Sequence, residues 1–183
     1  MTPSLATRIN AFGVLGMCFI LLGAYYVQFV EGEFPCPLCL LQRLAMLGVA
    51  FGAMLNLRYG LHPQHYSISI ISAIFGACVS MRQVLLHIAP GTSGYGSAVL
   101  GLHLYTWALI VFVVAIFLIA VMMFFEGQFE ENVDNKSTSN LSWFIKAVFL
   151  LVLLIAAANV LTTFFECGIG QCPDNSTSYK ELS

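Results

Sequence analysis

Four of the six cysteines form two closely spaced pairs. Cys36 and Cys39 belong to the segment CPLC, and Cys167 and Cys172 belong to the segment CGIGQC. Residues three apart in the first turn of a helix bring their Cα atoms within the roughly 4.4–6.8 Å that a disulfide allows. In the second pair, two glycines permit the sharp turn that closes a small disulfide ring. All four are therefore candidate catalytic residues for thiol–disulfide exchange.

Polar residues lie inside apolar stretches close to the first pair. Arg43 follows Cys39 by four residues, a spacing that places both side chains on one helix face. An arginine within a membrane span costs on the order of 2.5–3.5 kcal/mol and so needs a reason. Arg82 poses the same question, with Gln42, Gln83 and His87 expected in the same layer. We take Arg43, Arg82 and His87 as candidate cofactor-binding residues.

The elements that must position these residues are membrane spans. Of the 183 residues, 59% are hydrophobic and 9% are charged, whereas a soluble domain carries about a quarter charged residues. Five apolar runs are each long enough to cross a hydrocarbon core of ~30 Å as a helix. The sequence predicts a single integral membrane domain with spans at 11–30, 39–57, 66–88, 104–125 and 143–165 and a tail at 166–183. A net charge of −2 with scattered cations argues against nucleic-acid binding.

The positive charges near the span ends predict the orientation. One side carries four cations and the other carries Lys180, and the cation-rich side of a membrane protein is usually cytoplasmic. The four are Arg8, Arg58, Lys136 and Lys146. The N-terminus is therefore expected in the cytoplasm. Five spans then place both cysteine pairs together on the outer side, where disulfides persist.

Electrons taken from a thiol need an acceptor. The sequence shows no CxxCH haem attachment, no GxGxxG fingerprint and no pair of histidines within the spans to hold a haem. The acceptor is therefore expected to be a separate molecule. A quinone dissolved in the bilayer fits a CxxC pair at the membrane surface, because the arginine beneath it can stabilise negative charge that develops on a quinone oxygen. Cys39, near a helix N-terminus, is the expected thiolate.

The segment CPLC followed by LLQR, and the segment MRQV in the third span, resemble the disulfide bond formation protein B family. The resemblance covers the chain up to about Phe125 and implies a four-helix transmembrane bundle, here with a fifth transmembrane helix. It also implies an all-α enzyme of the bacterial inner membrane that oxidises a periplasmic thioredoxin-fold, DsbA-like dithiol protein and passes the electrons to ubiquinone or menaquinone. By motif, Cys39 is the sulfur next to the quinone and Arg43 the arginine that contacts it.

The chain departs from the family pattern in its second cysteine pair. In the best-known members that pair lies in the outer loop between spans three and four, but residues 89–103 contain no cysteine here. Cys167 and Cys172 follow the fifth span instead. Their role as the pair that oxidises the partner is inferred from topology.

Several alternatives stand beside this interpretation. The second pair could be a structural disulfide that staples the tail, and Arg43 and Arg82 could extend toward lipid headgroups. His87 could be an ordinary interface residue. Four outer cysteines could instead hold a zinc ion, or the chain could be a redox-inert scaffold or small transporter.

Overall fold

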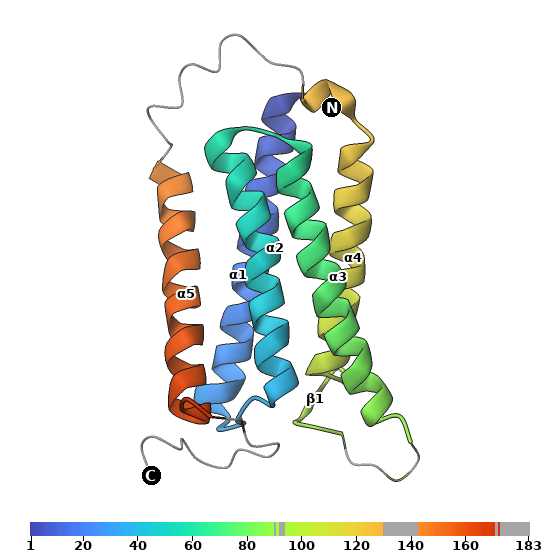
Figure 1. Ribbon diagram of the computed structural model, residues 1–183, viewed down its shortest axis with the longest axis vertical. Helices are drawn as coiled ribbons and strands as arrows, with labels where there is room; N and C mark the ends of the chain where they lie inside the picture. Colours follow the sequence, from blue (N-terminus) through green and yellow to red (C-terminus); the bar gives the residue numbers. More distant parts are fainter. Residues whose placement is uncertain (90, 92–93, 130–142, 171, 173–183) are drawn as a thin grey trace.

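The computed structural model describes residues 1–89, 91, 94–129, 143–170 and 172, and within them five long α-helices dominate (Figure 1). Each helix is long and apolar enough to cross a membrane. The chain is therefore an all-α membrane protein, as its composition predicts. The helices are α1 (Pro3–Val30), α2 (Pro37–Tyr59), α3 (Pro63–Leu86), α4 (Leu104–Met123) and α5 (Trp143–Cys167).

The helix ends differ from the predicted spans where local capping decides them. α1 begins at Pro3 rather than residue 11, because Thr2 accepts the N–H of Leu5 at 3.4 Å and proline suits the first helical position. α5 continues through Cys167, so Glu166 and Cys167 form its last turn. Helix α5 therefore extends two residues beyond the predicted fifth span.

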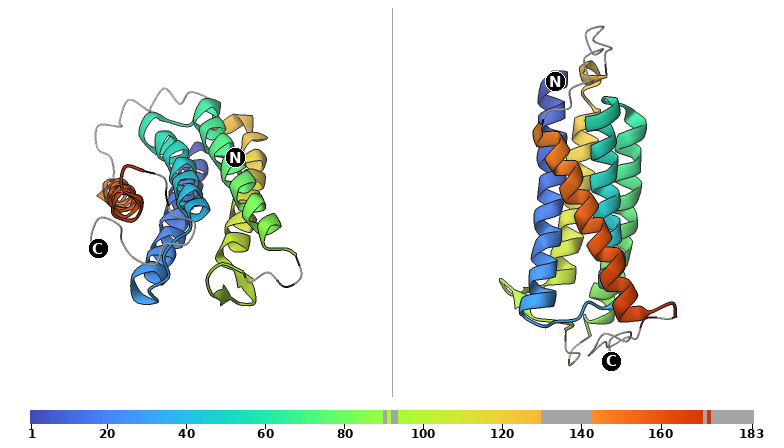
Figure 2. Two further views of the ribbon diagram at one scale, coloured as in Figure 1. Left: turned by 60° about the horizontal axis from the view of Figure 1, so that its bottom comes forward. Right: turned by 90° about the vertical axis from the view of Figure 1, so that its left-hand side faces the viewer.

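Helices α1 to α4 form an up-and-down bundle, and α5 lies outside it against α1 and α2 (Figures 1 and 2). The core contains Val14 and Leu21 of α1, Ala50 of α2 and Phe112 of α4. Gly76 of α3 faces the Phe112 ring so closely that any Cβ would collide with it. Small residues of this kind let membrane helices approach each other.

Two further features mark opposite ends of the bundle. A short hairpin, β1 (Ala98–Val99) and β2 (Leu102–His103), precedes α4 at the lower end of Figure 1.

At the other end, Asn10 links α1 to α2 and α3. Its side-chain amide donates to the hydroxyl of Tyr66 at 2.8 Å, and its amide oxygen accepts from Asn56 at 3.1 Å. Tyr66 in turn donates to Gln128 of the 3-10 helix η1 (Glu126–Gln128) at 3.0 Å. These buried hydrogen bonds fasten one end of the bundle.

The helix directions decide which loops share an end. The segment between α1 and α2 and the last turn of α5 lie at the end where the hairpin lies, opposite to the N-terminus (Figure 1). Arg8, Arg58 and Lys146 belong to the N-terminal end. Lys136 and Lys180, which also entered the orientation argument, lie outside the described residues, as does the tail beyond residue 172.

Candidate active site

The first disulfide joins Cys36 and Cys39 where α2 begins, with the two Cα atoms 5.0 Å apart. Pro37 is the first helical residue, so Cys36 is the N-cap, and its Sγ accepts the backbone N–H of Cys39 at 3.1 Å. The helix N-terminus therefore acts on Cys36, because its orphan N–H group points at that sulfur. This differs from the expectation that Cys39 is the favoured thiolate. Cys36 is buried and Cys39 is half-buried.

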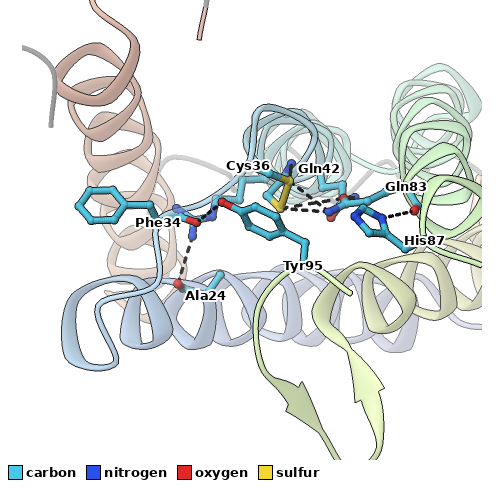
Figure 3. The surroundings of a disulfide bond; sticks show 9 residues. Ala24, Phe34, Cys36, Gln42, Gln83, His87 and Tyr95 are labelled. Atoms are coloured by element: carbon cyan, nitrogen blue, oxygen red, sulfur yellow. Dashed lines mark hydrogen bonds between the residues drawn. A yellow bond between two sulfur atoms is a disulfide. The ribbon is translucent and has the colours of Figure 1, made fainter. Parts of the chain in front are cut away.

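A glutamine from α3 contacts both sulfurs of this disulfide (Figure 3). Nε2 of Gln83 lies 3.1 Å from Sγ of Cys36 and 3.6 Å from Sγ of Cys39. Its Oε1 accepts a hydrogen bond from Nε2 of Gln42 at 2.8 Å. Gln83 is 1% exposed and Gln42 is 5% exposed, so water does not compete for these contacts. The two amides form a buried donor directed at the disulfide.

Arg43 is buried, and its guanidinium extends toward α1. Nη1 donates to Oε1 of Gln28 at 2.6 Å, and Nη2 donates to the carbonyl oxygen of Ala24 at 3.1 Å. The same group lies over the Tyr25 ring, 4.9 Å from its centroid. Because the side chain is only 7% exposed, the alternative of a guanidinium extended to lipid headgroups does not describe it. Arg43 instead places a fixed positive charge inside the bundle, one helical turn from Cys39.

The other two candidate cofactor residues lie in different surroundings. Nδ1 of His87, the C-cap residue of α3, lies 2.9 Å from the carbonyl oxygen of Gln83, and its ring stacks on Tyr105 at 5.4 Å. Arg82 is exposed and lines an apolar groove of about 590 Å³ between α3 and α4, with Cys78 and Leu109. The structure therefore brings His87 to the edge of the disulfide site, whereas Arg82 belongs to an outer surface.

The segment before α4 is pinned to the loop that carries the disulfide. The hydroxyl of Tyr95 donates to the carbonyl oxygen of Phe34 at 2.8 Å, and the N–H of Ser97 donates to the Glu33 carboxylate at 3.0 and 3.1 Å. Burial, followed by the negative charges of Glu166 and Glu33, raises the pKa of Tyr95. Glu166, in the last turn of α5, is therefore close enough to act on Tyr95. We call the contacts of Tyr95 and Ser97 with Phe34 and Glu33 the clamp; it ends two residues before Cys36.

The second disulfide joins Cys167 and Cys172 at the same end of the bundle, with the Cα atoms 4.4 Å apart. Gly168 has a φ of +64°, a conformation that suits glycine and turns the chain out of α5. Cys167 is 3% exposed, whereas Cys172 is half-buried and the intervening Ile169 is 97% exposed. The ring thus joins one buried cysteine to one half-buried cysteine.

The zinc alternative gains no support from this geometry. Both cysteine pairs are disulfides. Among the described residues, no group of three or more His, Cys, Asp or Glu side chains is arranged to hold a metal ion. Cys18 and Cys78 are free thiols, the first buried and the second exposed.

Two parts of this site are not predicted by the sequence. Gln83 is expected in the same membrane layer as Arg43, but its contact with the sulfurs depends on how α3 is rotated against α2. A buried polar residue beside an intramembrane arginine was the available sign of a role. The clamp of Tyr95 and Glu33 joins two short loops, for which the sequence offers no periodic pattern.

The comparisons with known proteins show which family the chain resembles. A family model described as "Disulfide bond formation protein DsbB" matches residues 6–94, which include the first disulfide, Arg43, Arg82 and His87 but not the second cysteine pair. "Disulfide bond formation protein B 1" of Pseudomonas fluorescens strain Pf-5 is 32% identical over 138 residues, covering 56% of this chain and 81% of that protein.

Two other relatives show the same likeness. The protein of that name from Pseudomonas fluorescens strain Pf0-1 is 31% identical over 141 residues, which cover 58% of this chain and 83% of the relative. "Disulfide bond formation protein B" of Aromatoleum aromaticum is 30% identical over 93 residues, covering 46% of this chain and 54% of the relative. No solved structure matches the chain.

Proposed function

Because the chain belongs to the disulfide bond formation protein B family and is a multi-pass membrane protein of disulfide formation, we propose that it is a protein-dithiol:quinone oxidoreductase. It reoxidises a periplasmic thioredoxin-fold, DsbA-like dithiol protein and passes the electrons to a membrane quinone. The observation that carries the proposal is the Cys36–Cys39 disulfide, which caps a membrane helix at the end where the second disulfide lies.

The proposed reaction moves two electrons and two protons in each of three exchanges. The partner's dithiol becomes a disulfide while the Cys167–Cys172 bond opens to a dithiol. That dithiol closes again as the Cys36–Cys39 bond opens. The Cys36–Cys39 dithiol then returns to the disulfide by giving two electrons and two protons to a quinone, which leaves as the quinol. Each of the first two steps breaks one S–S bond and forms one, and the third forms one S–S bond for each quinone reduced to the quinol.

We propose which sulfur of the second disulfide the partner attacks first from the exposure of the two cysteines. An attacking thiolate must reach a sulfur along the disulfide axis, and Cys172 is half-buried whereas Cys167 is almost completely buried. Attack at Cys172 releases Cys167 as the leaving thiol at the C-terminus of α5, where the helix dipole disfavours negative charge. Access decides between the two effects, because a buried sulfur is not attacked by another protein at all. Ile169, exposed between them, offers the partner an apolar contact.

The residues around the first disulfide suit a quinone as electron acceptor. Arg43 supplies a buried positive charge one helical turn from Cys39, and His87 supplies a ring nitrogen beside Gln83. These groups can stabilise negative charge on a quinone oxygen. Arg82 lines a groove whose walls are apolar and open toward the membrane, so it is proposed to contact the quinone on its way to the site. A bound quinone would itself accept the two electrons.

We place the chain in the bacterial inner membrane with the N-terminus in the cytoplasm. Arg8, Arg58 and Lys146 all belong to the end of the bundle opposite to the disulfides, and cytoplasmic ends are the cation-rich ones. With this orientation both disulfides face the periplasm, the compartment in which disulfides are made.

The decisive experiment is an assay of quinone reduction. The purified full-length protein is given a reduced periplasmic thioredoxin-fold protein and a short-chain ubiquinone or naphthoquinone, and the quinone absorbance is followed. We expect one quinone reduced for each partner disulfide formed, and no turnover in the Cys36→Ser variant. Oxidation of the partner without quinone loss would assign a different acceptor, and no oxidation of the partner would reject the proposed reaction.

A further inference from the structure

A groove of about 400 Å³ separates α2 from α5 at the N-terminal end of the bundle. Its apolar walls are Phe51 and Met54 of α2 and Phe149 of α5. Phe51 lies seven residues before Arg58, so the groove extends about 10 Å along the helices. The groove depends on the fifth helix, because α5 supplies one of its two sides and a bundle of α1 to α4 alone would leave the α2 side open.

Two cations from different helices lie at the rim of this groove. Arg58 is in the last turn of α2, and Lys146 is in the first turn of α5. The guanidinium of Arg58 lies over the Tyr59 ring, 5.4 Å from its centroid. Among the described residues that line the groove there is no Asp or Glu. The rim therefore carries two positive charges above an apolar channel.

We propose that this groove binds an anionic phospholipid, with the phosphate between Arg58 and Lys146 and an acyl chain along Phe51, Met54 and Phe149. Basic pockets between membrane helices at an interface are typical sites for anionic headgroups. The exposed aromatic rings of Tyr59 and Trp143 lie at the ends of these same helices, the level at which aromatic side chains meet headgroups. The lipid joins α5 to the bundle where their direct packing is incomplete.

The shape of the groove distinguishes a lipid from other anions. A free phosphate would use the two cations and leave the apolar channel unfilled, whereas a phospholipid fills both parts. A segment of another protein would have to enter from within the bilayer. The chemistry of the whole groove, rather than of its rim, therefore selects a molecule with a negative head and a long apolar chain.

Titration with lipid tests the site on the full-length protein in detergent after lipid removal. Native mass spectrometry measures the apparent Kd of the first dioleoylphosphatidylglycerol adduct, with dioleoylphosphatidylcholine as the uncharged comparison. We expect phosphatidylglycerol to bind more tightly. Arg58→Gln and Lys146→Gln should each weaken it about fivefold, and the double variant about 25-fold. The exchanged variant Arg58→Lys/Lys146→Arg keeps both charges and should bind like the unmodified protein.

Arg8→Gln is the matched control, because Arg8 is an exposed cation at the same end of the bundle that does not line the groove. It should leave lipid affinity unchanged, and all variants should keep their unfolding temperature in lipid-free detergent. Equal affinity for the two lipids, an unaffected double variant, or an equal loss in Arg8→Gln would overturn the proposal. Competition by soluble glycerol 3-phosphate at equal concentration would also overturn it, because the site would then be one for free phosphate.

Discussion

Gln83 donates a hydrogen bond from Nε2 to Sγ of Cys36 across a distance of 3.1 Å. Gln42 fixes the direction of that donor by occupying the amide oxygen of Gln83. A donor aimed at sulfur interacts more strongly with a thiolate than with a disulfide, because the bond is then assisted by charge. The arrangement therefore favours the reduced form of the pair and makes its disulfide a better oxidant.

The variant Gln83→Leu should lower the reduction potential of the Cys36–Cys39 pair. Loss of a hydrogen bond to a charged group is worth about 1.5–3 kcal/mol, which for a two-electron couple corresponds to roughly 30–60 mV. Redox titration in a Cys167→Ala/Cys172→Ala background measures the pair by itself. Gln128→Leu, a buried glutamine at the opposite end, should reduce stability without moving the potential. An equal shift in both variants would contradict a local effect.

Arg43→Met should raise the KM for quinone about tenfold to a hundredfold, since one charge-assisted hydrogen bond is worth ~1.5–3 kcal/mol. The methionine keeps much of the buried volume while removing the charge. Steady-state quinone reduction at saturating partner dithiol measures the effect. Arg8→Met is the control, because it removes an exposed cation at the far end. An unchanged KM would leave Arg43 the role of fixing α2 to α1 through Gln28 and Ala24.

With a partner whose single remaining cysteine carries a thionitrobenzoate group, the free Cys172 thiol of Cys167→Ala should displace thionitrobenzoate and form a lasting mixed disulfide, whereas the buried Cys167 thiol of Cys172→Ala should not. Cys172 is half-buried whereas Cys167 is 3% exposed, and neither protein keeps a second thiol at this site to resolve the mixed disulfide. Non-reducing electrophoresis after mixing with the partner detects the trapped complex. Trapping in Cys172→Ala alone would reverse the assignment.

Ending the chain after Glu166 should separate the two half-reactions. The shortened protein keeps the Cys36–Cys39 pair, so a small dithiol that enters detergent micelles should still reduce quinone through it. Oxidation of the thioredoxin-fold partner should be lost, as partner dithiol assays can show. Full-rate oxidation of the partner by the shortened protein would make the second disulfide a structural staple.

Tyr95→Phe should loosen the segment over the first disulfide, because it removes the hydrogen bond to Phe34. Loss of about 0.5–1.5 kcal/mol predicts amide exchange of Ser97 faster by roughly twofold to tenfold. Tyr26→Phe, on the outer face of α1, is the control. The phenol must be protonated to donate, and its pKa is raised. The stabilisation should therefore be complete below the ordinary tyrosine pKa of about 10 and disappear only as pH rises through the higher folded value.

Reporters fused after Glu33 and after Ser183 should both read as extracytoplasmic, and a reporter within residues 126–142 should read as cytoplasmic. An odd number of spans after a cytoplasmic N-terminus places the C-terminus on the outer side. Paired alkaline phosphatase and fluorescent protein fusions make the measurement. A cytoplasmic C-terminus would place the two cysteine pairs on opposite sides of the bilayer and end the proposed relay.

The number of helices and the end on which each cysteine pair lies could be predicted from the sequence. Apolar runs of about twenty residues have few alternatives in a bilayer, and an odd number of them fixes which loops share an end. The structure confirms the bundle with its additional helix, and it places both disulfides at one end. These inferences need no knowledge of how the helices are rotated.

The directions of the side chains could not be predicted in the same way. The spacing of Cys39 and Arg43 fixed their shared helix face, but the guanidinium turned toward Gln28 because α1 offers it buried acceptors. The contact of Gln83 with Cys36 joins residues 47 apart in sequence, so only the packing of α3 on α2 creates it. Cys36 became the N-cap because the helix begins one residue later, at Pro37. The exact start of the helix thus decides which of the two cysteines takes the N-cap position.

The position of α5 outside the bundle has an evolutionary consequence. Cys36, Gln83 and Arg43 belong to α2, its N-cap and α3, whereas α5 packs on the outside of the bundle and adds the second disulfide at its own end. Mutations at an exposed position of the ring that follows α5, such as Ile169, can therefore accumulate without disturbing the helices that hold the first disulfide. Selection can alter the surface beside the second disulfide while the surroundings of the first are inherited unchanged.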